Sequence, residues 1–321
     1  MTADATPHLI VPFAQCGGDE GLSAVSALKL SKLGQLLRAM LLIHTDNGLP
    51  NSLSPPHERA LARALGLTDC TDGLIPWAAL EAQTQTYAQA IPGQGWAVIT
   101  PCHWAMGREH ATLNDPATLE LSEAESRTLL AAMQPYFATE GITLHYAQPT
   151  RWLAEGEVFR SLPTASLDRV LGRNVDRWLP HSKAIKLLQN EMQMLLYTHP
   201  VNDERAARGQ VSVNSFWLSG SGALERPVAS CPHVKTATHL VQPALASDWV
   251  AYAQAWTALD DTDIAQLLAQ QKNGATVRLS LCGDSKAMTF ETAPQGVLAR
   301  IRGVLSPLPA INMLKQLSKY E

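Results

Sequence analysis

The sequence carries little charge. Asp, Glu, Lys and Arg make up 17% of its 321 residues, and 25 basic side chains stand against 29 acidic ones, a formal net charge of −4 at pH 7. Proteins that bind a nucleic-acid backbone carry an excess of basic residues. Because hydrophobic residues make up 46% of the chain, the composition also excludes a disordered chain. We expect a folded globular protein that does not bind nucleic acid.

Cysteine is scarce as well, and no two cysteines form a CxxC pair. An odd number of scattered cysteines favours free thiols in a reducing compartment over a disulfide framework. The sequence has no run of ~18 apolar residues, the length of a membrane span, and residues 1–7 lack the features of a signal peptide. We therefore expect a cytoplasmic protein without a membrane partner. The five cysteines are Cys16, Cys70, Cys102, Cys231 and Cys282.

Short apolar runs alternate with segments in which apolar residues recur every three or four positions. This alternation predicts an α/β fold with a mostly parallel sheet flanked by helices. Ser122 and Glu125 form a capping box, which predicts a helix that ends near Gly141. Strands are expected at residues 8–13, 96–100, 142–147, 213–218, 275–281 and 287–290. Helices are expected at residues 23–43, 55–66, 122–141, 182–197, 248–259 and 260–271.

Cys102, His103, Arg108 and His110 follow the predicted strand at residues 96–100. In open α/β sheets, ligands bind in the crevice beyond the carboxyl ends of the strands, so these side chains are placed where function is expected. A Cys–His pair can supply an activated thiolate nucleophile or ligands for a divalent metal. The alternative is that His103 only closes a loop.

Three arginines, Arg169, Arg173 and Arg177, recur at steps of four residues. On a helix their guanidinium groups would share one face and could bind a phosphate or a carboxylate. Asp168 and Asp176 lie among them and could instead neutralise them in ordinary ion pairs, which is the favoured interpretation.

Two further segments could present groups to a ligand. Pro200 ends the predicted helix at residues 182–197, so His199 and Asn202 are expected on a loop. Farther along, Ser and Gly alternate at residues 219–222, and the backbone amides of such a loop could hold an anion. Gly-Ser turns are also common without any ligand.

An aromatic stripe is followed by an acidic cluster. Trp249, Tyr252 and Trp256 recur at helical spacing, which indicates a packed face or, alternatively, an exposed surface for a protein partner. Asp260 and Asp263 stand at the start of a predicted helix, where Asp is expected as a cap. A divalent-cation site is the alternative.

Several motifs together resemble the RpfE-type regulatory proteins of proteobacteria, a family sometimes labelled phosphoglycerate mutase. The longest are LLYTHPVNDER at residues 195–205 and VNSFWLSGSG at residues 213–222. The shorter ones are TPCHW at 100–104, SLDR at 166–169, GRNVD at 172–176 and QNEMQM at 189–194. More distantly, the chain is similar to archaeal-type cofactor-independent phosphoglycerate mutases of the alkaline-phosphatase-like superfamily.

The resemblance implies an alkaline-phosphatase-like core formed by residues 1–103 and 213–321, interrupted by an inserted cap region at residues 104–212. It also implies that His199, Asn202, Arg205 and Asn214 line the junction of cap and core. Together with the residues singled out above, the predicted ligand-binding set is Arg108, Arg173, Asn174, His199, Asn202, Arg205, Asn214, Ser219, Gly220 and Gly222.

The chain departs from these mutases where they hold two divalent metals on Asp and His ligands. Their first strand ends in Asp-Gly, whereas here Gln15 is followed by Cys-Gly with no carboxylate before Asp19. Their late strand ends in an Asp-His pair, whereas Asp284 has no adjacent His, and Ser219 replaces an Arg. Two-metal phosphoryl transfer needs such ligands to converge. We therefore expect no mutase activity and no resident cofactor.

The leading hypothesis is a pseudoenzyme, a cytoplasmic regulatory or ligand-binding protein for a small anionic ligand. One alternative is an active mutase-like or phosphohydrolase-like enzyme on a small phosphorylated substrate, with Cys102, His103 and His110 as catalytic residues and the arginine segment as anion holder. A bound divalent metal is a separate alternative. A second alternative is a protein–protein interaction module or homo-oligomer that uses the aromatic stripe.

Overall fold

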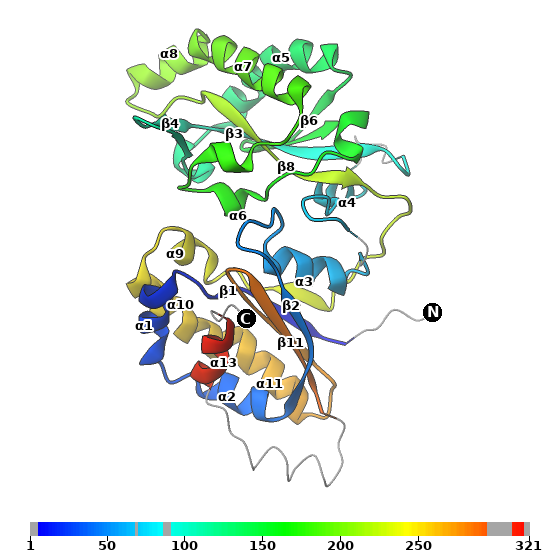
Figure 1. The fold of residues 1–321 in the computed structure, drawn as a ribbon, viewed down its shortest axis with the longest axis vertical. Helices are drawn as coiled ribbons and strands as arrows, with labels where there is room; N and C mark the ends of the chain where they lie inside the picture. Colours follow the sequence, from blue (N-terminus) through cyan, green and yellow to red (C-terminus); the bar gives the residue numbers. More distant parts are fainter. Residues whose placement is uncertain (1–5, 68–69, 86–90, 294–309, 318–321) are drawn as a thin grey trace. The chain divides into compact units, whose positions relative to one another are not determined.

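The chain forms two compact units, one discontinuous and one continuous (Figure 1). The computed structural model describes residues 6–67, 70–85, 91–293 and 310–317. The first unit comprises residues 1–68 and 229–321, and the second comprises residues 69–228. The predicted boundaries, after residues 103 and 212, both fall inside the second unit. The reason is that strands β3 (Gly95–Cys102) and β8 (Ser215–Ala223) pair with each other there.

The first unit is built on a mixed five-stranded sheet in the order β2-β11-β10-β1-β9. Strand β1 is parallel to β10 and β9, whereas β11 is antiparallel to both β10 and β2. The prediction of a mostly parallel sheet was therefore wrong. Only two residues, Asp284 and Ser285, join β10 to β11, and so short a loop makes a hairpin. The bounds are β1 His8–Gln15, β2 Met40–Asn47, β9 Val234–Thr236, β10 Arg278–Gly283 and β11 Lys286–Thr292.

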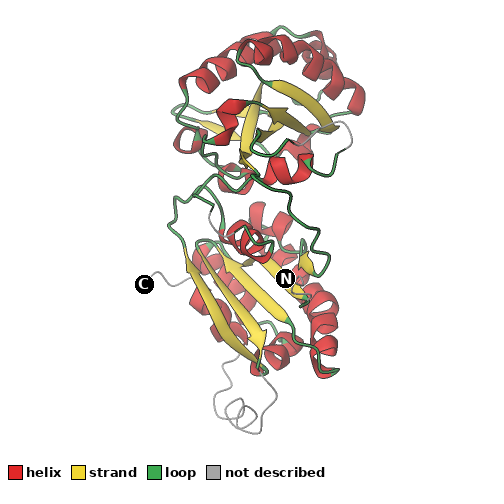
Figure 2. Ribbon diagram, turned by 90° about the vertical axis from the view of Figure 1, so that its right-hand side faces the viewer, coloured by secondary structure: helices red, strands yellow, loops and turns green. Residues whose placement is uncertain are grey.

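Helices cover both faces of this sheet (Figure 2). Helix α3 (Pro56–Ala64) lies on the face that carries Ile10 and Cys282. The other face carries the larger hydrophobic core, in which Leu33, Leu279 and Trp256 are fully buried. Its helices are α1 (Gly18–Ser26), α2 (Ser31–Arg38), α9 (Val241–Leu245), α10 (Trp249–Leu259), α11 (Ala265–Lys272) and α13 (Ala310–Leu317).

The predicted helix at residues 23–43 is in fact two helices and a strand, α1, α2 and β2. The apolar residues at 40–42 pair with β11, because a partner strand far along the chain outweighs their local helical spacing. The acidic cluster also differs from expectation. Residues Asp260–Ile264 form a π-helical turn, and the Asp260 carboxylate accepts hydrogen bonds from the backbone N–H groups of Leu33 (2.7 Å) and Lys32 (3.2 Å). Asp260 therefore caps α2 rather than its own helix.

The second unit contains an antiparallel four-stranded sheet in the order β6-β7-β3-β8. Helix α5 (Glu123–Thr139) and helix α7 (Lys183–Tyr197) bury apolar side chains against one face, and α4 (Trp77–Ala82) packs on the other. The capping box of Ser122 and Glu125 is confirmed at the start of α5. The remaining elements are the strands β4 (Trp104–Met106), β5 (Ala111–Leu113), β6 (Thr143–Gln148) and β7 (Arg151–Glu155), with helices α6 (Leu167–Val170) and α8 (Pro200–Ala207).

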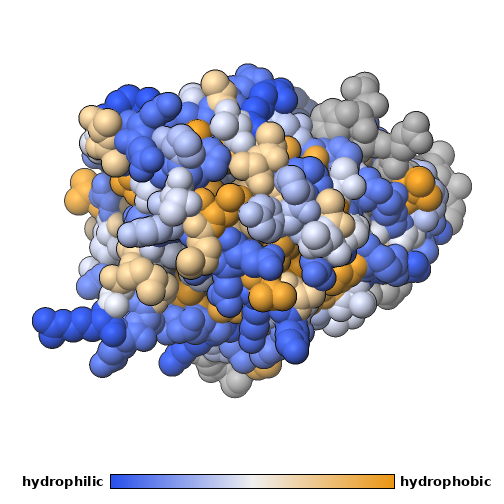
Figure 3. Space-filling view, turned by 90° about the horizontal axis from the view of Figure 1, so that it is seen from above, coloured by the Kyte–Doolittle hydropathy of each residue, from blue (hydrophilic) through white to orange (hydrophobic). Residues whose placement is uncertain are grey.

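Hydrophobic side chains on the surface are interspersed with hydrophilic ones in the view of Figure 3. On α7, for example, Leu187, Met194 and Tyr197 are exposed. Isolated apolar residues of this kind are ordinary on protein surfaces. No helix in the described ranges combines the length and the apolar character needed to cross a bilayer.

The aromatic stripe belongs to the core of the first unit, because Tyr252 and Trp256 are both 0% exposed. We predict that Trp256→Ala lowers the free energy of unfolding by about 3–5 kcal/mol, the usual cost of deleting a buried aromatic side chain. Val250→Ala, at an exposed position of the same helix, should leave it within about 0.5 kcal/mol. Urea unfolding of both variants measures the difference. A folded Trp256→Ala protein of normal stability would contradict this burial.

Candidate functional site

The carboxyl ends of β1 and β10 lie side by side, since Gln15 pairs with Gly283. This is the end of a parallel pair at which ligands are expected. Here it is closed by side chains. The ring of Trp249 lies so close to Gly17 that a Cβ at this glycine would overlap it. Gly17 has a φ of 70°, so glycine is favoured there by backbone conformation as well as by space.

The polar groups at these strand ends do not fit a two-metal centre. Cys16 is 4% exposed, and burial together with the negative charge of Asp284 raises the pKa of its thiol to about 12. The amide of Gln15 donates to the carbonyls of Cys16 (3.5 Å) and Gly18 (3.4 Å), within the same turn. Within the described part of the chain, no three His, Cys, Asp or Glu residues are grouped so that they could hold a metal ion.

The structure separates the four candidates of the segment 102–110. Cys102 is fully buried at the end of β3, and this burial raises the pKa of its thiol. The imidazole of His103 donates from Nδ1 to the carbonyl of Ser212 at 2.9 Å. Arg108 and His110 lie at the exposed turn between β4 and β5. A buried thiol with a raised pKa supplies almost no thiolate at neutral pH. Catalysis by Cys102, His103 and His110 stays a prediction.

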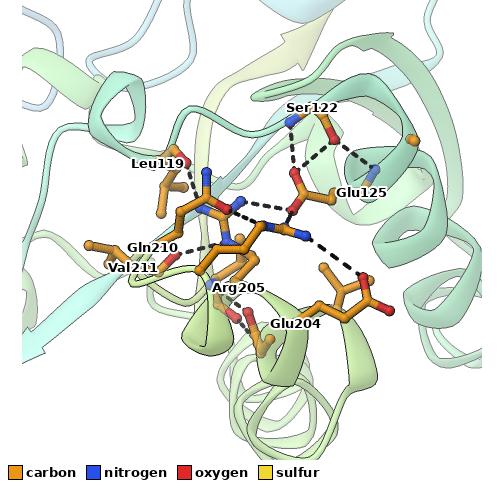
Figure 4. Close-up of polar contacts among 12 residues, drawn as sticks. Leu119, Ser122, Glu125, Glu204, Arg205, Gln210 and Val211 are labelled. Carbon is orange, nitrogen blue, oxygen red and sulfur yellow. Dashed lines mark hydrogen bonds and ion pairs between the residues drawn. The ribbon is translucent and has the colours of Figure 1, made fainter.

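Arg205 is buried in a network that joins α8 to the start of α5 (Figure 4). Its Nε donates to the carbonyl of Val211 (2.9 Å) and its Nη1 to the Glu125 carboxylate (3.2 Å). Its Nη2 donates to the carbonyl of Leu119, and Arg208 also binds Glu125. Each of the three guanidinium nitrogens has a partner within the chain.

Asn202 and Asn214 also form hydrogen bonds with the backbone. The Asn202 amide donates to the carbonyls of Leu196 and Val213, both at 2.8 Å, and accepts from the Val213 N–H at 2.9 Å. The Asn214 side chain accepts from the Trp104 N–H (2.7 Å) and donates to the Trp104 carbonyl (3.0 Å). Both asparagines thus tie irregular segments to neighbouring strands and helices.

His199 caps helix α8, because its Nδ1 accepts a hydrogen bond from the Val201 N–H at 3.2 Å. Burial lowers the pKa of His199, although the nearby charge of Asp203 opposes this shift. A neutral imidazole that accepts through Nδ1 carries its proton on Nε2. The expected loop after residue 199 is therefore the first turn of a helix, with Pro200 at its first position.

The Ser and Gly residues at 219–222 lie within strand β8 and do not form an anion-binding loop. Gly220 and Gly222 instead allow α4 to approach, because a Cβ at Gly220 would lie 3.1 Å from Cβ of Trp77, and one at Gly222 would lie 3.0 Å from Cβ of Pro76. Ser219 stands opposite Val98 in the pairing of β8 with β3.

The segment with the three arginines is not one helix, because Gly172 has a φ of 67° and separates α6 from a 3₁₀ turn at Val175–Trp178. Arg173 is exposed, and the Asn174 side chain accepts a hydrogen bond from the Asp176 N–H (2.9 Å) as the cap of that turn. Ligand binding by these residues stays a prediction.

Four of the predicted residues converge, but on one stretch of backbone. Arg205 binds the carbonyl of residue 211, His103 that of residue 212, and Asn202 both backbone groups of residue 213. Asn214 itself is tied to Trp104, and its N–H donates to the carbonyl of Cys102 at 3.1 Å. We call these bonds the 211–214 clamp. All four side chains hydrogen-bond to the chain itself, and ligand binding by Asn202, Arg205 and Asn214 stays a prediction.

Comparison with known proteins gives distant likenesses to solved structures. No family model matches the chain, and no curated protein matches it. One similar solved structure is a cofactor-independent phosphoglycerate mutase from Thermoplasma acidophilum, at 14% identity and a TM-score of 0.36, covering 98% of this chain and 100% of the other. Another is the PH0037 protein from Pyrococcus horikoshii, at 9% identity and a TM-score of 0.45, covering 98% and 99%. Membership of the RpfE-type family stays a prediction.

Thiol reactivity should rank the cysteines by burial. We predict that Cys16, Cys102 and Cys282, which are buried and whose pKa values burial raises, react with iodoacetamide at pH 8 at least about 100-fold more slowly than Cys70 and Cys231. Peptide mapping by mass spectrometry over a time course gives the five rates. Fastest labelling at Cys102 would restore it as a candidate nucleophile.

The contribution of Glu125 to stability should depend on pH, because its carboxylate pairs with Arg205 of the clamp. Burial by itself would raise the pKa of this carboxyl, but hydrogen bonds from Ser122 and the charge of Arg205 outweigh it and lower the pKa. A lowered pKa means that the ionised carboxylate stabilises the fold above pH ~4.3 and that this contribution disappears as pH falls through the folded-state pKa. Glu125→Gln leaves the buried Arg205 charge without its partner, and we expect a loss of about 3 kcal/mol at pH 7.

The control is Glu123→Gln, which removes an exposed carboxylate two residues away in an ion pair with Arg127. This variant should change stability by at most about 0.5 kcal/mol. Denaturant unfolding at pH 7 and pH 3 measures all three proteins, and wild type and Glu125→Gln should approach each other at pH 3. A difference that is equal at both pH values would contradict a role for the ionised Glu125.

Proposed function

We propose that this protein is a cytoplasmic regulatory or ligand-binding protein with a degenerate, alkaline-phosphatase-like architecture and no phosphoglycerate mutase activity. The observation that carries the proposal is the closure of the strand ends of β1 and β10, where the ring of Trp249 packs onto Gly17. A mutase of this superfamily would need that space for two metals and a transferring phosphoryl group.

The side chains at the carboxyl ends of β1 and β10 also support the absence of mutase activity. A phosphoryl-transfer centre needs several carboxylates and imidazoles, because their charge and geometry fix the divalent cations. Gln15 and Cys16 stand where the first carboxylate would be required, and the Cys16 thiol stays protonated because burial and Asp284 raise its pKa to about 12. These residues can shape a buried turn, and they cannot neutralise two cations.

The motif shared with mutases supports a structural role. The side chains of the motif residues hydrogen-bond to the backbone, within the 211–214 clamp and beside it. These residues are Asn202, Arg205 and Asn214. The resemblance of these segments to mutases therefore fits inheritance of a fold in which the chemistry has been replaced. The ligand expected for such a protein is a small anion similar to a mutase substrate, which the protein would bind without converting it.

A coupled mutase assay tests the proposal. We expect no conversion of 3-phosphoglycerate to 2-phosphoglycerate above the background rate, with or without 1 mM Mn²⁺, which is about the concentration that would saturate ordinary protein sites. Asp284→Asn provides the control, because removal of a metal ligand would abolish any metal-dependent turnover. Turnover that requires Mn²⁺ and is lost in Asp284→Asn would refute the proposal.

A further inference from the structure

A cavity of about 500 Å³ opens in the first unit, on the face of the sheet that carries α3. Its lining includes the first residue of each of three neighbouring strands, His8 of β1, Val234 of β9 and Arg278 of β10. The cavity thus lies at the start of the parallel strands, opposite to the end that Trp249 closes. Its volume is within the range of small-molecule sites, ~300–1,000 Å³.

The lining of this cavity is basic. Arg63, Arg278, His8, His44 and His233 contribute to it, and among the described residues that line it none is Asp or Glu. Arg278 is paired with Glu291, whose carboxylate lies 2.6 Å from its Nε, so the excess positive charge comes from Arg63. A pocket wall with one sign of charge raises the local concentration of ions of the opposite sign. An anion is therefore the ligand that this lining favours.

The charge of Arg63 is only partly neutralised. Its Nη2 lies 4.0 Å from the Asp46 carboxylate, but the same carboxylate receives three closer hydrogen bonds from Arg59, at 3.0–3.1 Å. One carboxylate is thus shared by two guanidinium groups, which leaves a surplus of positive charge. Burial and, after it, the charge of Arg63 lower the pKa of His44, although the charge of Asp46 opposes this shift.

A row of polar side chains runs across four adjacent strands on this face of the sheet, and three of its members, His8, His44 and Thr289, line the cavity. His8 Nε2 and Ser280 Oγ are 2.8 Å apart, and Ser280 Oγ and Thr289 Oγ1 are also 2.8 Å apart. His44 stands opposite Thr289 in the next strand. The same face is otherwise apolar, with Ile10 and other small hydrophobic residues. Such a row offers hydrogen-bonding groups at the level where the head of a ligand would rest.

The rest of the wall is apolar. Ile43, Leu65 and Val234 line the cavity, and Ile43 is half exposed although it lies in a strand of the sheet. An inorganic ion would leave these side chains in water, whereas a ligand with a hydrocarbon body would cover them. Burial of each CH₂ group is worth about 0.8 kcal/mol.

Helix α3 ends beside this cavity, and the negative end of a helix dipole disfavours an anion. The effect is limited here. The last carbonyls accept hydrogen bonds from N–H groups of the following turn, Gly66 to Arg63 (3.0 Å) and Leu67 to Ala62 (2.8 Å). The full charge of Arg63, in the last turn, also exceeds the roughly half charge of the dipole.

We propose that this cavity binds a small organic anion, with its carboxylate or phosphate group beside Arg63 and the polar row and its apolar body against Ile43, Leu65 and Val234. The proposal extends the proposed function by giving the ligand a site and a chemical class. It rests on that function only in treating the chain as a ligand-binding protein.

Isothermal titration calorimetry on the full chain, with acetate, butyrate, hexanoate, butyl phosphate and inorganic phosphate as probes, tests the cavity. We expect affinity to rise about fourfold for each added methylene from acetate to hexanoate. Butyl phosphate should bind at least about tenfold more tightly than inorganic phosphate. Comparison of butyrate with butyl phosphate distinguishes a carboxylate head group from a phosphate head group.

Arg63→Gln should weaken the binding of hexanoate and butyl phosphate about tenfold, since a charge-assisted contact is lost. Arg38→Gln, which makes the same change at an exposed position outside the cavity, should leave the affinities unchanged. Ala64→Phe should block binding by filling the space beside Leu65. If this variant does not fold, Arg63→Gln decides alone, because its side chain is 44% exposed and its loss should be tolerated.

The proposal is overturned if the wild type binds none of the probes at millimolar concentration, if affinity is independent of chain length, or if Arg63→Gln binds as well as wild type. Such a result would leave the proposed lack of mutase activity intact. Conversely, mutase turnover would refute the proposed function without altering the binding measured here.

Discussion

The backbone of residues 211–214 has no regular secondary structure, and Val213 within it is buried, so the polar backbone groups of this residue must be hydrogen-bonded. Side chains supply those bonds. Arg205, His103 and Asn202 each take one of the three consecutive carbonyls, and the Asn214 N–H binds the carbonyl of Cys102. Strand β8 begins directly after this stretch, so the clamp sets where β8 meets β3. The packing of α4 against Gly220 and Gly222 depends in turn on that placement.

Although the chain has few charged residues, several of them are buried. Arg205 is fully buried with three partners, and Asp260 caps the start of α2 from a different helix. In each case a charged group replaces backbone hydrogen bonds that secondary structure does not supply. A cavity in a chain with few charges can still be basic. Arg63 and Arg59 share a single carboxylate, Asp46, so the positive charge near the cavity is not fully neutralised.

Features that depend on local sequence could be predicted, and features that depend on distant contacts could not. The capping box at Ser122 was correct because both partners lie within one helical turn. Residues 40–42 were placed in a helix because their pairing with β11, some 250 positions away, leaves no local mark. The motif residues were recognised as polar and clustered, but side-chain type does not reveal whether the partner is a ligand or a carbonyl. The basic cavity was missed altogether, since His8, Arg63 and Arg278 are far apart in sequence. The polar residues His8, Arg278 and Ser280 on otherwise apolar strands were the one available signal.

The discontinuity of the first unit also sets the order in which its sheet can be completed during synthesis. Strand β1 is made at the start of the chain, but its parallel neighbours β9 and β10 begin only at Val234 and Arg278. All of residues 69–228, the whole second unit, emerge between them. The backbone N–H and C=O groups along both edges of β1 therefore have no strand partners until the complete second unit has been synthesised, and the sheet of the first unit is completed only after the second unit has emerged.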